Sequence, residues 1–234
     1  ENSEKIILCL SGFISAIGTV MLPKVSRMTR MKQMDAVKRH IRLSMELVMC
    51  MVCAMAFGLA AVAVNFAPLF YGDDFAYSGM LMMPLAFTLL SIGFANVIRT
   101  QWVLPQGRDT IFVHSVLTGA VINLIANFVL IPPFGAMGAA AATVLAEFSV
   151  PAVQFVYLRK ELPYAQYLKT TGVYCLFGLV MAGAVALLGY VLPLYGWGKL
   201  AVQVIGGAAV YGALCLTYWK LAKRSDIFRL MRRK

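Results

Sequence analysis

Seven long apolar runs divide the sequence, and they constrain its fold more than any other feature. A helix needs about 20 apolar residues to cross the hydrocarbon core of a bilayer. Most of the runs are that long, and the first is near the minimum. They cover residues 6–22, 43–66, 79–103, 111–131, 136–158, 171–194 and 200–219. Because every backbone group in lipid must be satisfied within its own segment, we predict an all-α, polytopic transmembrane helix bundle with about seven spans.

The basic residues predict the orientation of this bundle. The formal net charge is +11, and the assignment of seven spans places 19 of the 21 lysines and arginines on one side. Loops rich in these residues stay in the cytoplasm. We therefore predict a multi-pass membrane protein with a cytoplasmic C-terminus. A basic amphipathic segment at 24–42 and a basic tail at 220–234 are expected to meet anionic lipid, and no nucleic-acid partner is expected.

One carboxylate at mid-membrane depth is the strongest single candidate for function. Glu147 lies halfway along the run 136–158, where an acidic side chain costs roughly 2.5 kcal/mol or more. Pro151 has no N–H, so the carbonyl of Glu147, four residues earlier, loses its helical donor. This pair of groups predicts a proton or Na⁺ coupling site, or a hinge. A structural hydrogen bond from the protonated carboxyl is the equal alternative.

Amide side chains and one arginine form the candidate substrate site. A guanidinium binds phosphate oxygens through two parallel hydrogen bonds, so Arg99 is a candidate phosphate contact; the alternative is an arginine that extends to the membrane surface. For the asparagines, the alternative is a hydrogen bond between helices. The predicted substrate-binding residues are Arg99, Asn96, Gln101, Asn123, Asn127 and Gln154, and the predicted ion-coupling residue is Glu147.

Enzyme chemistry is not predicted. Cys50 and Cys53 form a CxxC motif inside an apolar run, without a second pair, and the sequence has only two histidines. Small packing residues are the favoured interpretation, so we expect no metal, no cofactor and no catalytic residue. A membrane polymerase or ligase needs a sizeable aqueous loop, and the predicted outer loops contain only a few residues.

The start of the sequence predicts a longer polypeptide. Glu1 is not an initiator methionine and no signal peptide precedes the first run, although the charge distribution places this end outside. We therefore expect an N-terminal lobe of the same polypeptide to be a partner of this chain.

Four segments together resemble a known family. They are GTVMLPKVSRM (Gly18–Met28), PLFYGDDF (Pro68–Phe75), NVIRTQWVLPQGRD (Asn96–Asp109) and IPPFGAMGAAAATVLAEF (Ile131–Phe148). They are similar to polysaccharide biosynthesis flippases, the O-antigen and capsule repeat-unit transporters of the multidrug/oligosaccharidyl-lipid/polysaccharide exporter superfamily. The resemblance implies two helical lobes around a central cationic cavity, with this chain similar to the C-terminal half.

The resemblance also implies a substrate and a mechanism. It implies that undecaprenyl-pyrophosphate-linked oligosaccharide repeat units are flipped across the bacterial cytoplasmic (inner) membrane by alternating access for surface polysaccharide export. The diphosphate requires arginine, the sugar requires amides and hydroxyls, and the lipid tail requires apolar grooves, so membrane lipids and this substrate are the expected partners. The alternatives are a cation-coupled multidrug exporter of the same superfamily, which requires carboxylates in its cavity, and a membrane scaffold that transports nothing.

Overall fold

The computed structural model describes residues 2–193 and 195–221, and within these residues the chain forms helices and short turns without a strand. The all-α prediction is therefore confirmed. The helices, in chain order, are α1 (Asn2–Arg30), α2 (Met34–Tyr71), α3 (Ala76–Ala86), α4 (Thr88–Ile98), α5 (Asp109–Leu158), α6 (Tyr164–Val191) and α7 (Gly196–Leu221), with short 3-10 or π-helical turns at Asp73–Phe75, Arg99–Val103 and Leu104–Gln106.

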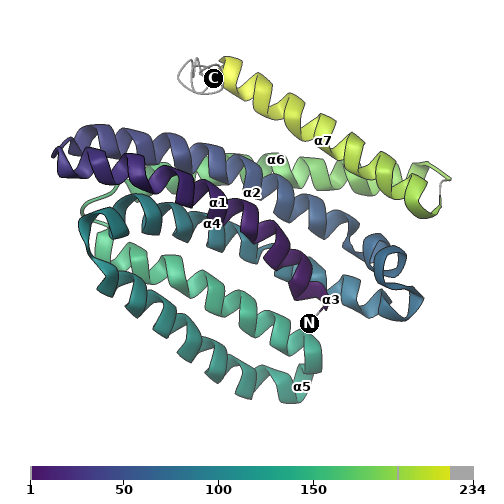
Figure 1. The fold of residues 1–234 in the computed structure, drawn as a ribbon. Coiled ribbons are helices and arrows are strands. Elements are labelled where there is room, and N and C mark those ends of the chain that lie inside the picture. The colour runs from purple at the N-terminus through teal and green to yellow at the C-terminus, as the bar shows by residue number, and fades with distance from the viewer. Residues whose placement is uncertain (1, 194, 222–234) are drawn as a thin grey trace.

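Six helical stretches of the described chain are long and apolar enough to cross a membrane, with α3, α4 and the adjoining turns counted as one stretch. The longest, α5, contains 50 residues and doubles back on itself (Figure 1). The reversal occurs at Gly135, whose φ of 55° and ψ of −131° are not helical, and two prolines precede it. Glycine tolerates a positive φ, which explains its place here. The two arms of α5 bring the apolar segments to seven.

The basic segment 24–42 forms the end of α1, a short turn and the start of α2. Lys32 lies in the turn with a φ of 57°. Within the tail 220–234, only Lys220 and Leu221 lie inside the described residues, so the predicted anchor at 222–234 lies outside them.

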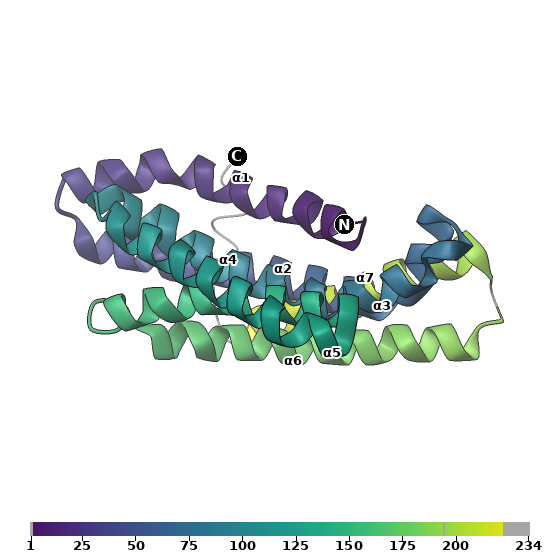
Figure 2. The same ribbon diagram turned by 90° about the horizontal axis from the view of Figure 1, so that it is seen from below.

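The helix α2 is the centre of the bundle, because it packs against α1, α3, α4, α6 and α7. Its buried side chains include Met45, Met49, Val52 and Ala56. The hairpin arms of α5 and the last helix α7 lie on opposite sides of the bundle (Figure 1), and α1 and α6 lie on opposite sides in Figure 2. The core therefore surrounds α2, and α5 stays largely open to its surroundings.

Cysteines and one buried acid lie where α2 meets α6 and α7. The sulfur of Cys50 lies 3.6 Å from that of Cys215, and the sulfur of Cys53 lies 3.7 Å from that of Cys175. These thiols are free. Nearby, Tyr174 donates a hydrogen bond to Glu46, which is 3% exposed. The CxxC motif therefore serves the packing of three helices.

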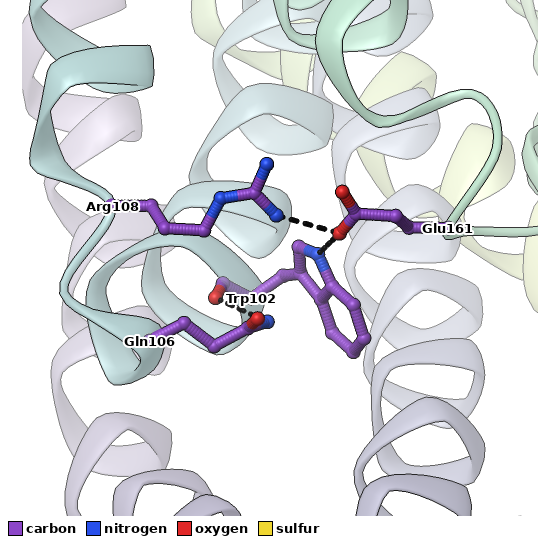
Figure 3. A network of polar contacts seen from close by, with 4 residues as sticks. All are labelled: Trp102, Gln106, Arg108 and Glu161. Carbon is purple, nitrogen blue, oxygen red and sulfur yellow. Dashed lines mark hydrogen bonds and ion pairs between the residues drawn. The ribbon is translucent and has the colours of Figure 1, made fainter.

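The turn after α4 is tied to the turn between α5 and α6 by Glu161 (Figure 3). Its Oε2 accepts hydrogen bonds from Arg108 at 2.6 Å and from the indole N–H of Trp102 at 3.0 Å. Lys38 of α2 lies over the Trp102 ring, 5.7 Å from its centroid. Burial would raise the pKa of Glu161, but the hydrogen bonds from Arg108 and Trp102 outweigh burial and hold it below its usual range.

Tight packing between α2 and α3 gives the first prediction. A Cβ on Gly79 would lie 2.7 Å from the backbone oxygen of Ala63, so Gly79→Val must separate the two helices. Overpacking of this kind costs about 1–3 kcal/mol, and we expect a lower thermal unfolding midpoint in detergent. Gly12→Val is the control, because a Cβ there meets no atom within 4 Å. Equal midpoints for the two variants would contradict this packing.

The contacts of Glu161 give the second prediction. A carboxylate with a lowered pKa stabilises the fold above its ordinary value of 4.5, and this contribution disappears as the pH falls through the lowered value. Arg108 and Glu161 are each about a third exposed, so Glu161→Gln should lower the free energy of unfolding by about 0.2–1 kcal/mol at neutral pH. As the pH falls below 4.5 and through the lowered pKa, its unfolding midpoint should approach that of the parent. Asp74→Asn, at an exposed position, is the control, and a difference that persists unchanged at low pH would refute this account.

Candidate functional site

The candidate site is a cavity of about 560 Å³ between α1, α4 and the two arms of α5. Five of the seven predicted site residues line it: Asn96, Arg99, Asn123, Glu147 and Gln154. Ser15 of α1 and Thr143 of α5 add hydroxyls to its wall. The cavity therefore combines one cation, one carboxyl group and several neutral polar groups among apolar side chains.

Helix geometry explains why these side chains converge. Asn96 and Arg99 are three residues apart and share one face of the helix that runs from α4 into the turn Arg99–Val103. In α5, the reversal at Gly135 sets the arm with Asn123 beside the arm with Glu147. A Cβ on Gly119 would lie 3.3 Å from the backbone oxygen of Ala146, so the small residue permits the close approach of the arms.

Arg99 is held in place by two neighbours and retains free donor capacity. One terminal nitrogen donates a hydrogen bond to the Asn96 side chain at 2.9 Å, and its guanidinium carbon lies 4.9 Å from the centroid of the Phe112 ring. Its Nε is buried and has no hydrogen-bond partner among the described residues. A guanidinium has five N–H donors. Arg99 is thus a fixed cation in the cavity wall with donors available for an anion.

The side-chain amide of Asn96 bonds to two other parts of the protein. Its nitrogen donates a hydrogen bond to the backbone oxygen of Ile14 on α1 at 3.0 Å, while its oxygen accepts the bond from Arg99. A Cβ on Gly18 would lie 2.7 Å from the Asn96 side-chain nitrogen, so the glycine allows α1 to approach. Asn96 therefore positions both α1 and Arg99.

The carbonyl that Pro151 frees has a partner. The hydroxyl of Ser91 on α4 donates a hydrogen bond to the backbone oxygen of Glu147, so the helix distortion near Pro151 is joined to α4. The Glu147 side chain lines the cavity from the same residue. The carboxyl group therefore lies at a point where α4 and the second arm of α5 are directly linked. Sequence reasoning did not find this contact of Ser91 with Glu147, because residues 56 positions apart give no local signal.

The remaining predicted residues differ in their surroundings. The Gln154 side chain is 1% exposed, and its oxygen has no hydrogen-bond partner within the described chain. Asn127 does not line the cavity and donates a hydrogen bond to the Asn123 side-chain oxygen at 3.0 Å. Gln101 is completely buried in the π-helical turn and also does not line the cavity. Asn127 thus contacts a residue that lines the cavity, whereas Gln101 lies apart from the cavity.

Comparison with known proteins identifies the family. The sequence model of one family, described as lipid II flippase MurJ, matches residues 1–206. A protein named as an O-antigen transporter of Shigella dysenteriae is 22% identical over 136 residues, which are 58% of this chain and 33% of that protein. The low-salt glycan biosynthesis flippase Agl15 of Haloferax volcanii is 22% identical over 219 residues, which are 93% of this chain and 46% of that protein.

A solved structure shares the fold. It is titled lipid II flippase MurJ, inward closed conformation, and the match has a TM-score of 0.77 at 16% identity. The match covers 93% of this chain and 46% of that one, so this chain spans about half of its length. The resemblance to polysaccharide flippases is confirmed, and the apolar helices are those of a multi-pass membrane protein. Because the family match covers most of the sequence, the chain belongs to the lipid II flippase MurJ family.

Proposed function

We propose that this chain is part of a transporter that flips undecaprenyl-pyrophosphate-linked oligosaccharide repeat units across the bacterial cytoplasmic membrane by alternating access. The observation that carries the proposal is the cavity with Arg99 in its wall. A fixed guanidinium with free donors suits a diphosphate. The descriptions of the related proteins, which concern lipid II, O-antigen and glycan, support the class of substrate.

The other polar groups of the cavity suit the sugar. Asn123, Thr143 and Gln154 offer amide and hydroxyl groups at different points of its wall. A few convergent polar groups in a mainly apolar cavity are typical of sites that orient a ligand. The lipid tail would lie against apolar surface, of which α5 exposes Leu124, Phe128 and Val129.

We also propose that an N-terminal lobe of the same polypeptide completes the passage. This chain spans 46% of the structural neighbour's length, and α5 buries few of its side chains within the described bundle. A second lobe placed against α1 and α5 would close the cavity. In this arrangement the basic segment 24–42, which is the end of α1 and the start of α2, faces the cytoplasm, and so does the C-terminus.

The third prediction tests Arg99 in the complete polypeptide. Loss of charge-assisted hydrogen bonds to the diphosphate should weaken the affinity for the substrate by about 10- to 100-fold. We therefore expect Arg99→Ala to fail to restore surface polysaccharide in cells that lack this flippase, with partial restoration by Arg99→Lys. Arg159→Ala is the matched control, since Arg159 is exposed and outside the cavity. Full restoration by Arg99→Ala would rule out this role for Arg99.

The fourth prediction tests ion coupling by Glu147. In proteoliposomes with the complete polypeptide, Glu147→Gln should remove the dependence of translocation on an imposed proton or Na⁺ gradient, because the amide cannot gain or lose the charge. Asp74→Asn should leave this dependence unchanged. Ion-dependent translocation that persists in Glu147→Gln would dismiss the coupling role. Ion-driven export of organic cations, lost in Glu147→Gln and unaffected by Arg99→Ala, would instead support the multidrug exporter.

A further inference from the structure

Two basic hollows lie on either side of Arg39, at the start of α2. The first has a volume of about 290 Å³ and is lined by Lys38, Arg39 and Arg42, with Pro163 and Gln166 from the start of α6. The second has a volume of about 280 Å³, and its polar lining is Lys24, Gln33, Arg39 and His40. Among the residues that the structure describes, no acidic residue lines either hollow. None of these residues lines the cavity between α1, α4 and α5.

The positive charge of these hollows is largely uncompensated. Among the described residues, no carboxylate forms an ion pair with Arg39 or Arg42. Lys38 is the exception, because it lies over the Trp102 ring and close to Glu161. The Nε2 of His40 is buried without a hydrogen-bond partner in the described structure. Burial and the charge of Lys24 lower the pKa of His40, and an anion in the second hollow would act in the opposite direction and raise it.

The surroundings favour a lipid over a free anion. The hollows lie at the basic side of the bundle, where α1 ends and where α2 and α6 begin. Further along α6, the exposed large side chains are apolar and include Leu168, Leu176 and Leu179. A phospholipid would place its phosphate among the bases and its acyl chains beside this apolar surface. Free phosphate would use only the bases.

We infer that the two hollows around Arg39 bind the phosphate groups of anionic phospholipids from the cytoplasmic leaflet. Bases in a hollow between helix ends suit such a headgroup, because each contributes attraction to the anionic surface. Arg39 lines both hollows, and Arg42 adds a second uncompensated guanidinium to the first. A lipid in the first hollow contacts both α2 and α6, and one in the second contacts both α1 and α2. Bound headgroups therefore join the bend between α1 and α2 to the start of α6.

The test is native mass spectrometry of the purified protein in detergent, titrated with phosphatidylglycerol or phosphatidylcholine. We expect phosphatidylglycerol to bind more tightly, and Arg39→Gln with Arg42→Gln to weaken its binding about 10- to 30-fold. The matched control is Arg159→Gln with Lys160→Gln, which removes two exposed charges from the neighbouring turn. Arg39→Lys with Arg42→Lys should retain most of the binding.

A second measurement covers the case in which the double variant fails to fold. In the parent protein, titration of His40 followed by NMR should show a higher pKa in phosphatidylglycerol nanodiscs than in phosphatidylcholine nanodiscs. Equal His40 titration in the two lipids would overturn the inference, as would equal loss of binding in the control pair. Two results would show that the lipid does not occupy the hollows. In the first, inorganic phosphate binds but displaces no phosphatidylglycerol. In the second, inorganic phosphate binds and phosphatidylglycerol does not.

Discussion

The absence of water from the bilayer core is the constraint on which this structure depends. A polar group there must find its partner within the protein. Several side chains of the described residues meet this requirement by donating to backbone oxygens of other helices. Asn96 bonds to Ile14, Ser91 to Glu147, and Gln203 to Val185. These contacts join neighbouring helices, and the first two involve residues that line the cavity, Asn96 and Glu147.

The packing density differs between two parts of the bundle. The dense part supports the fold, and the less dense part carries much of the candidate site. Around α2, packing is dense, and side chains such as Met49 and Val52 have no exposed surface. The arms of α5 bury far less, although they carry Asn123, Thr143, Glu147 and Gln154. The second arm is linked to α4 through Ser91, and Asn96 of α4 and Arg99 of the following turn line the cavity. The cavity is thus built on one rigid wall and one lightly packed hairpin.

Much of this arrangement could be predicted from local sequence rules. The apolar runs predicted the helices, and the break between the runs 111–131 and 136–158 predicted the reversal inside α5. Residues three, four or seven apart share a helix face, so the spacing of Asn96 and Arg99, and of Glu147 and Gln154, anticipated that each pair would face one region. The structure places all four in the lining of one cavity.

Other features have no local signal. Gln101 lies in a π-helical turn, where the wider winding changes the direction of each side chain relative to an α-helix. It was proposed for its residue type, although at about 100° per residue it lies roughly 200° around the helix from Arg99. The bonds of Glu161 to Trp102 and Arg108 join residues more than 50 positions apart. Such contacts become visible only after the helices are placed against one another.

Whether the cavity is a passage for a lipid-linked diphosphate is tested most directly by thiol accessibility in the complete polypeptide. The native cysteines are first replaced, and Asn123→Cys is then treated with a membrane-impermeant thiol reagent. Ile125→Cys, from an exposed apolar position on the same arm, serves as the lipid-facing control. Our account predicts that Asn123→Cys reacts, that undecaprenyl-pyrophosphate-linked oligosaccharide protects it, and that Ile125→Cys does not react. Equal reactivity at the two positions without protection by the substrate would contradict it.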